Sequence, residues 1–173
     1  MEVDVARAAV ADAARLRALR LRALRADPDA FWAVAAEEED RPDAHWRERL
    51  GEDGVATFLA RRGQDVGLVV VRAHHDVPGD AGLYAMWVAP ECRSLGVATA
   101  LMAAAVEWAR AAGYPAVRLE VADHNTAAIG LYARFGFRPT GRTGALPPPR
   151  EHIAEHELAL VLSAPPPTSA QEP

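Results

Sequence analysis

Lysine is absent from this chain of 173 residues, and its 19 basic side chains other than histidine are all arginine. A P-loop for nucleoside triphosphates requires a lysine after its second glycine, so the sequence excludes that kind of phosphate site. Cysteine occurs once, at Cys92, which excludes an internal disulfide. No apolar run reaches the ~18 residues of a membrane span, and the N-terminus lacks the apolar stretch of a signal peptide. We therefore expect a soluble, cytoplasmic protein without a membrane partner.

A concentration of positive charge is also missing. The 24 acidic residues outnumber the 19 arginines, which gives a net charge of −5 and a pI near 5.7. Because no basic stripe offsets repulsion from a phosphate backbone, nucleic acid is not an expected partner. The arginines at 7–25 are typical of the solvated face of a helix, and a protein-interaction surface there would rest on charge alone. The six histidines lack the spacing of a metal site, so no metal is expected.

The composition is that of a compact folded protein, with 50% hydrophobic and 25% charged residues. This length and composition predict one domain over residues 1–162. Residues 163–173 are rich in Pro, Ser, Thr and Ala, and we expect them to form a flexible C-terminal tail. The sequence does not specify the oligomeric state, and a homodimer is one of the alternatives.

Strand and helix patterns alternate along the chain. Helices are expected at 12–25, 30–49 (with a start near 42–43), 99–112 and 126–135, and strands at 3–8, 55–61, 66–72, 82–88, 116–121, 137–140 and 156–162. The strand–helix–strand unit at 83–121 must be parallel and right-handed. In such sheets ligands bind at the carboxyl ends of the strands, so a site is expected there.

The segment 83–98 is the most informative part of the sequence. Its strand pattern stops at Pro90, and a turn of small residues then opens directly into an apolar helix. The first N–H groups of a helix are unpaired and can hold an anion, above all a phosphate. Gly96 and Ala98 are small, as the close approach of a phosphate requires. With Gly96 as its only glycine, the turn does not fit a dinucleotide fingerprint, and we predict a phosphate cradle rather than an ordinary tight turn.

Two ordered motifs resemble those of the GNAT superfamily of N-acetyltransferases. Arg93-Ser-Leu-Gly-Val-Ala98 is similar to the family's Arg/Gln-x-x-Gly-x-Gly/Ala signature, whose turn holds the pyrophosphate of acetyl-coenzyme A. The family's second motif is matched in step by Leu119-Glu-Val121, Asn125, Ala128, Leu131-Tyr132 and Gly136-Phe137. The resemblance is tight over 83–140. It implies a single-domain α/β fold with a mixed, mostly antiparallel sheet, a central splayed pair of parallel strands and flanking helices.

Acetyl-coenzyme A (acetyl-CoA) is the co-substrate that this resemblance implies. The backbone of Met86 to Val88 would face its pantetheine arm, and the amides of Leu95 to Thr99 would face its pyrophosphate. Asn125 would contact the coenzyme and is equally suited to cap the helix after it. The cofactor-binding residues implied in full are Met86, Trp87, Val88, Arg93, Ser94, Leu95, Gly96, Val97, Ala98, Thr99, Asn125 and Tyr132.

Tyr132 and Glu120 are the catalytic residues implied by the resemblance. Tyr132 matches the tyrosine near the coenzyme sulfur, where it would act as a general acid or hold the thiolate by a hydrogen bond; a core tyrosine is the alternative. Glu120 would take the proton of the amine, directly or through water. The alternatives for Glu120 are a solvated strand residue or an ion-pair partner of Arg118 or Arg134.

Several other residues compete for these roles. Tyr84 and the acidic run at 37–40 are rival bases, although such a run most often forms a solvated helix face. His124 is more typical of an exposed loop residue than of a base. Cys92 lies near the cradle, where inert packing is more common than reactivity.

The implied function is transfer of an acetyl group from acetyl-CoA to a primary amine of a small molecule or peptide. The amine attacks directly, without a covalent enzyme intermediate. The alternatives are a coenzyme A binding or sensing module without turnover and a protein N-terminal acetyltransferase. No motif specifies the acceptor or the acyl-chain preference.

Overall fold

The computed structural model describes residues 2–162, so the expected tail at 163–173 lies outside the described residues. The strands are β1 (Asp4–Arg7), β2 (Ala56–Arg62), β3 (Gln64–Ala73), β4 (Ala81–Val88), β5 (Ala116–Ala122), β6 (Arg138–Ala145) and β7 (Ala154–Val161). The α-helices are α1 (Ala13–Ala26), α2 (Ala35–Glu39), α3 (Asp43–Gly51), α4 (Val97–Ala111) and α5 (Thr126–Phe135). None of these helices is both long and apolar enough to span a membrane.

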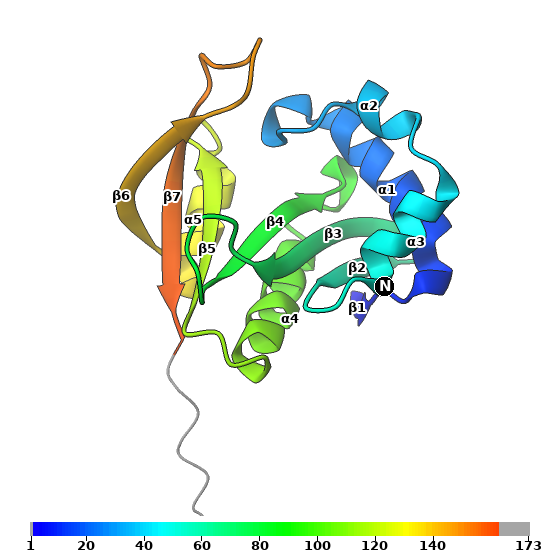
Figure 1. The fold of residues 1–173 in the computed structure, drawn as a ribbon, viewed down its shortest axis with the longest axis horizontal. Coiled ribbons are helices and arrows are strands. Elements are labelled where there is room, and N and C mark those ends of the chain that lie inside the picture. The colour runs from blue at the N-terminus through cyan, green and yellow to red at the C-terminus, as the bar shows by residue number, and fades with distance from the viewer. Residues whose placement is uncertain (1, 163–173) are drawn as a thin grey trace, which may run out of the picture.

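All seven strands form one sheet in the order β1-β2-β3-β4-β5-β7-β6 (Figure 1). The pair β4–β5 is parallel, and the other neighbouring strands are antiparallel. Helix α4 makes the connection between the two parallel strands, as the strand–helix–strand pattern predicted. The mixed, mostly antiparallel sheet with flanking helices confirms the predicted fold class.

Most predicted elements are present, and the differences lie at their boundaries. Helix α4 begins at Val97 rather than at residue 99, because Gly96 adopts a positive φ of 83° and ends the preceding turn. Strand β6 extends to Ala145 and β7 starts at Ala154, where the two residues pair. The glycines and proline within β6 concealed this extension, since both residue types are uncommon inside strands.

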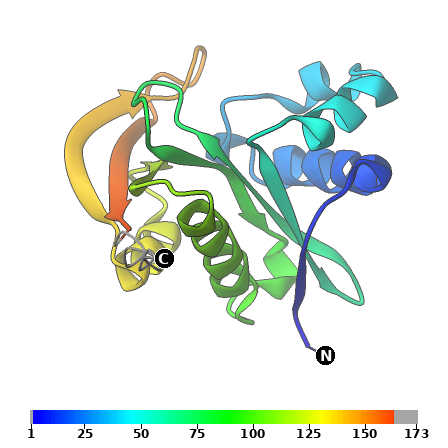
Figure 2. The same ribbon diagram turned by 60° about the horizontal axis from the view of Figure 1, so that its bottom comes forward.

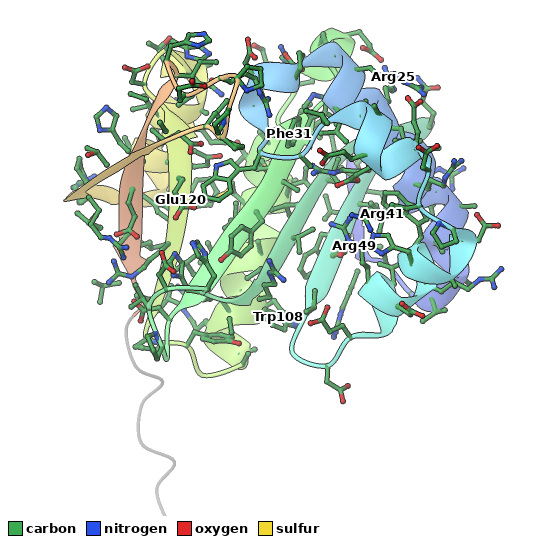
Figure 3. All side chains as sticks on the ribbon, turned by 45° about the horizontal axis from the view of Figure 1, so that its top comes forward. Arg25, Phe31, Arg41, Arg49, Trp108 and Glu120 are labelled. Carbon is green, nitrogen blue, oxygen red and sulfur yellow. The ribbon has the colours of Figure 1, made fainter. Side chains whose placement is uncertain are left out.

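Helices cover both faces of the sheet (Figures 1 and 2). Helix α4 lies close against β3 at Gly67, where an added Cβ would sit 2.9 Å from Leu101 Cδ1 and 3.0 Å from the Trp87 carbonyl oxygen. This close packing places the first turn of α4 beside the end of β4. On the opposite face, Figure 3 shows Glu120 of β5 on one side and Arg49 of α3 on the other, with β3 and β4 between them.

Candidate active site

The parallel strands β4 and β5 separate soon after they meet. Among the described residues their register contains two pairs, Ala81↔Val117 and Gly82↔Arg118, although β4 continues to Val88. A register irregularity follows on the β3 side, where Ala85 adopts a positive φ of 54°. Such bulges bend a strand and increase its twist. The β5-facing edge of β4 beyond Gly82 is therefore free to pair with an extended ligand.

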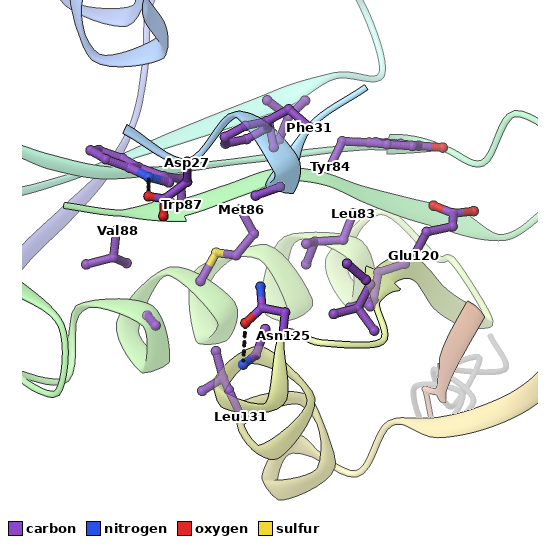
Figure 4. Close-up of a pocket in the computed structure, with 18 of the residues that line it drawn as sticks. Asp27, Phe31, Leu83, Tyr84, Met86, Trp87, Val88, Glu120, Asn125 and Leu131 are labelled. Carbon is purple, nitrogen blue, oxygen red and sulfur yellow. Dashed lines mark hydrogen bonds between the residues drawn. The ribbon is translucent and has the colours of Figure 1, made fainter. Parts of the chain in front are cut away.

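The irregularity at Ala85 also distributes the β4 side chains between two compartments. Figure 4 shows Leu83, Met86 and Val88 on the side of α4 and α5, and Tyr84 and Trp87 on the opposite side. Because strand residues normally alternate, Met86 would share the side of Tyr84 without this extra residue. The edge of β4 thus lies between two compartments. One compartment is beside α5, and the other is beside the segment that contains Phe31.

The predicted cradle has the geometry of an anion site. Ser94 and Gly96 both have positive φ angles, 62° and 83°. The first α4 backbone bond runs from Ala100 N to Gly96 O at 3.0 Å, which leaves the N–H groups of residues 97–99 without helical acceptors. A Cβ added at Gly96 would meet nothing within 4 Å, so the turn faces open space. These residues fit a pyrophosphate.

Arg93 and Trp87 direct their side chains to α1 rather than to the cradle. Arg93 Nε donates to the Val88 carbonyl at 3.1 Å, and its Nη2 pairs with the carboxylate of Asp27. Trp87 Nε1 donates to the same carboxylate at 2.7 Å. The coenzyme-binding role expected of Arg93 and Trp87 would therefore fall to their backbone groups.

Asn125 and Tyr132 approach the α4 side of this opening from α5. Asn125 Oδ1 accepts a hydrogen bond from Ala128 N at 3.2 Å, so Asn125 caps α5. Its amide nitrogen points away from the helix, toward Met86 (Figure 4). Tyr132 is buried, and burial raises the pKa of its phenol, which keeps the hydroxyl protonated at neutral pH. Both residues line the cavity described below.

Glu120 lies on the other side of β4 and is not an ion-pair partner of Arg118. Arg118 pairs with Asp80 at 2.6 Å and with Glu157 at 2.9 Å. Oε1 of Glu120 lies 3.6 Å from Nε2 of His74. Glu120 thus lines the cavity without an arginine partner among the described residues.

The rival bases are held by other contacts. Tyr84 Oη lies 3.0 Å from His75 Nδ1, and burial raises the pKa of its phenol. In the acidic run, Glu38 is buried and accepts two contacts of 3.2 Å from Arg20. Glu38 therefore does not belong to a solvated helix face. Its carboxylate is engaged in packing α2 against α1.

His74 and His75 come close to Glu120, a grouping that the sequence did not reveal. One potential ligand atom from each of the three residues lies within 4.8 Å of the others. However, His74 Nδ1 accepts hydrogen bonds from the N–H groups of Asp76 and Val77 at 3.1 and 3.0 Å. The proton of a neutral His74 ring then lies on Nε2, which leaves no lone pair there for a metal ion. This arrangement suits a donor toward Glu120 better than a metal ligand.

A cavity of about 1610 Å³ joins the two compartments. Its volume exceeds the ~300–1,000 Å³ of a typical small-molecule pocket. Sequence patterns did not identify part of its lining, because these residues come from elements far apart in the chain. They are Phe31, Trp32, Arg49, Arg72 and Glu155.

Comparison with known proteins identifies relatives in sequence. A model of the acetyltransferase (GNAT) family matches residues 16–137. Streptothricin acetyltransferase from Streptomyces lavendulae is 34% identical over an alignment of 129 residues, with 66% of this chain and 65% of that protein covered. The match thus spans just under two thirds of the relative's length.

Solved structures share the fold at lower sequence identity. Ribosomal-protein-alanine N-acetyltransferase from Brucella melitensis is 23% identical with a TM-score of 0.77, over 92% of this chain and 99% of that one. The protein yncA from Salmonella typhimurium, solved with its cofactor acetyl-CoA, is 18% identical with a TM-score of 0.75, over 95% and 98%. Since the family model also matches well over half of the sequence, this chain belongs to the GNAT family of acetyltransferases.

Proposed function

We propose that the protein transfers an acetyl group from acetyl-CoA to a primary amine of a small molecule by direct attack. The observation that carries this proposal is that one cavity is lined by the cradle, by Tyr132 and by Glu120. Tyr132 lies on the coenzyme side of β4, and Glu120 lies on the side left for a second substrate. A coenzyme-binding module without turnover would not need a base in that second space.

Acetyl-CoA supplies the thioester carbonyl and the thiol leaving group. The free N–H groups of Val97, Ala98 and Thr99 would hold its pyrophosphate, and the unpaired edge of β4 would hydrogen-bond its pantetheine amides. Because these contacts use backbone groups, they position the thioester without a charged side chain. Cys92 is buried, and the proposed reaction does not use it as a nucleophile.

The proposed proton transfers follow from the environments of Glu120 and Tyr132. The amine nitrogen forms a bond to the thioester carbon, the carbon–sulfur bond breaks, and the proton of the amine goes to Glu120. His74 Nε2 faces Glu120 and would keep its carboxylate in place through the Nε2–H donor. Tyr132, kept protonated by burial, would donate its proton to the departing sulfur.

Hydrogen bonds between two loops close one side of the space left for the acceptor. This closure supports a small amine as the acceptor over the N-terminus of a polypeptide. Arg150, in the loop between β6 and β7, donates to the carbonyl oxygens of Phe31 at 2.8 Å and Trp32 at 2.9 Å. These bonds join that loop to the segment between α1 and α2. A long acceptor chain would have to pass this connection, whereas a small amine would not.

The proposal is tested by incubating the purified protein with acetyl-CoA and a panel of primary amines. Release of free coenzyme A thiol is followed together with the mass of each amine product. Amine-dependent release with an N-acetylated product is expected. Coenzyme binding without amine-dependent release would contradict the proposal and would favour the binding-module alternative.

A further inference from the structure

The acceptor side of the cavity contains a buried guanidinium that the protein satisfies only in part. Arg20 of α1 directs Nε and Nη2 to Glu38, each at 3.2 Å. Its Nη1 is buried and has no hydrogen-bond partner among residues 2–162. Arg20 lies over the ring of Phe31, 4.6 Å from the centroid, and it lines the cavity. An unsatisfied donor on a buried charge is costly, so this position favours an acceptor group from a ligand.

Arg49 of α3 adds a second positive charge that is poorly compensated. It is half-buried, and the single carboxylate within 4 Å of it in the described part of the chain is Glu38, at 3.7 Å. That carboxylate already holds Arg20 at shorter distances. Burial lowers the pKa of Arg49, the charge of Glu38 raises it, and the charges of Arg20 and Arg72 lower it again. Arg20 and Arg49 therefore share the one carboxylate of Glu38.

Arg72 of β3 completes this basic end of the cavity, which consists of Arg20, Arg49 and Arg72. Its guanidinium lies 4.9 Å from the ring centroid of Tyr84, and no carboxylate of residues 2–162 lies within ion-pair distance of it. Arg72 is exposed at the cavity wall, where a ligand can reach it. Because a guanidinium matches the two oxygens of a carboxylate, this end is suited to an anionic group of that shape.

The opposite, acidic end of the cavity consists of Glu120 and Glu155. Glu155 of β7 accepts a hydrogen bond from Trp32 Nε1 at 2.9 Å and, like Glu120, has no arginine within ion-pair distance among the described residues. In the β5–β7 register Glu120 pairs with Glu157, so Glu155, two residues along β7, lies diagonally across from Glu120 on the same face of the sheet. Burial raises the pKa of Glu155, and the charge of Glu120 also raises it. This end is suited to an ammonium group.

A series of short contacts connects Arg72 of the basic end to Glu120 of the acidic end. The Arg72 guanidinium lies 4.9 Å from the Tyr84 ring centroid, and Tyr84 Oη lies 3.0 Å from His75 Nδ1. His75 in turn brings a ring nitrogen within 4.8 Å of a Glu120 carboxylate oxygen. Glu120 and Arg49 stand on opposite sides of the strands in this view (Figure 3).

We propose that the acceptor is a small zwitterionic amine of the amino-acid class, with its amine at Glu120 and its carboxylate at Arg49 and Arg72. The identity of the reacting amine rests on the proposed acetyl transfer, whereas the pairing of the two charges rests on the cavity itself. A purely cationic amine would leave the basic end uncompensated and would be repelled by it. An amine with a carboxylate satisfies both ends at once.

The test compares matched pairs of compounds, each an α- or ω-amino acid and its carboxamide. Initial rates of acetylation give kcat/KM for each member, and calorimetric titration in the presence of coenzyme A gives its Kd. We expect at least one amino acid to be preferred over its amide by about tenfold or more in both measurements. In Arg49→Gln and Arg72→Gln that preference should fall toward unity, while the values for the amide change little.

Arg110→Gln is the matched control, because Arg110 is an exposed arginine of α4 paired with Glu107, outside the cavity lining. It should keep the parent preference. Equal or better kcat/KM and binding for every amide would overturn the inference but leave the acetyl transfer standing. Tighter binding of an amino acid without acetylation would support the inference and contradict the proposed function. Absence of binding by every amino acid would overturn the inference.

Discussion

His74 Nε2 lies 3.6 Å from Glu120 Oε1, and this nitrogen is buried without a hydrogen-bond partner among residues 2–162. Because Nδ1 of the same ring accepts two backbone N–H groups, Nε2 is the donor that faces the carboxylate. Glu157 Oε2 is farther away, at 3.9 Å, and Glu157 already pairs with Arg118. The ring is thus fixed with its donor toward the one carboxylate of this group that has no arginine partner.

Glu120→Gln should slow acetylation of a high-pKa amine by about 10²-fold near neutral pH. An amine with a pKa near 10.4 is only about one part in a thousand neutral at pH 7.4, so the reaction depends on a base. As the pH rises toward about 9, more of the amine loses its proton to the solvent, and the rate of the variant should recover. The measurement is the pH profile of kcat/KM for parent and variant.

Glu107→Gln serves as the control for this change, because Glu107 is exposed on α4 and pairs with Arg110. It should follow the parent profile throughout. If Glu120→Gln keeps full activity with a high-pKa amine between about pH 6 and 9, Glu120 is structural. The base would then be sought at Tyr84 or in ordered water.

Tyr132→Phe should slow turnover by about 10- to 100-fold without recovery at higher pH. Burial raises the pKa of Tyr132, so the phenol stays protonated over this range and the lost function is proton donation to sulfur. Phe keeps the ring that packs 5.9 Å from Phe137, and the fold should be preserved. Rates at several pH values, with the Kd of coenzyme A, test this; recovery of the rate with rising pH would assign Tyr132 another role.

The sequence predicted the fold and the coenzyme side of the site more fully than the acceptor side. The cradle and the segment Asn125 to Phe137 are local patterns, in which neighbouring residues determine the backbone geometry. Arg49, Arg72 and Glu155 meet only through helix packing and the pairing of strands distant in sequence. No residue spacing links them, and their charges resemble those of any solvated surface.

Backbone features show the same contrast. Gly96 signals its positive φ because glycine adopts that conformation without a steric cost. Ala85 also has a positive φ, 54°, yet alanine gives no such signal. The irregularity that distributes Met86 and Tyr84 between the two compartments was therefore not predictable from the residue types.

Gly96→Glu should weaken binding of coenzyme A at least tenfold, about 1.4 kcal/mol. The substitution places a negative charge and a side chain at the turn where the pyrophosphate would lie. Gly113→Glu is a matched control, because Gly113 has the same φ of 83° and equally open surroundings at the other end of α4. Both variants carry the same backbone strain, so calorimetric titration isolates the effect of position; equal Kd values for the two would remove the cradle assignment.

Glu155→Gln should stabilise the protein at neutral pH and raise its Tm by about 2 °C. In a chain of this size, such a shift corresponds to a gain of less than ~1 kcal/mol in the free energy of unfolding. Burial raises the folded-state pKa of Glu155 above its unfolded value, so its favourable contribution exists at low pH and is lost as the pH rises through the folded pKa. Gln retains an oxygen to accept the hydrogen bond of Trp32. Thermal unfolding at about pH 4 and pH 7 should show the gain only at the higher pH.

If Glu155→Gln is instead less stable than the parent protein at pH 7, the folded protein favours the ionised carboxylate of Glu155. The positive charge of Arg150, which lowers the pKa of Glu155, would then outweigh burial. Glu107→Gln again provides the neutral reference, since its side chain is exposed.

Gly82→Ala should disturb the acceptor side of the site while leaving the coenzyme side intact. A Cβ at Gly82 would lie 2.3 Å from Tyr84 Oη and 2.5 Å from Cζ, so the tyrosine ring must move away from its contact with His75. We expect kcat/KM for the acceptor to fall by about tenfold or more, with the Kd of coenzyme A unchanged. Gly144→Ala in β6 is the control, because its added Cβ would meet nothing within 4 Å. A parallel loss of coenzyme affinity in Gly82→Ala would mean that the two compartments are not separated by β4 as described, whereas unchanged acceptor kinetics would remove Tyr84 from the acceptor site.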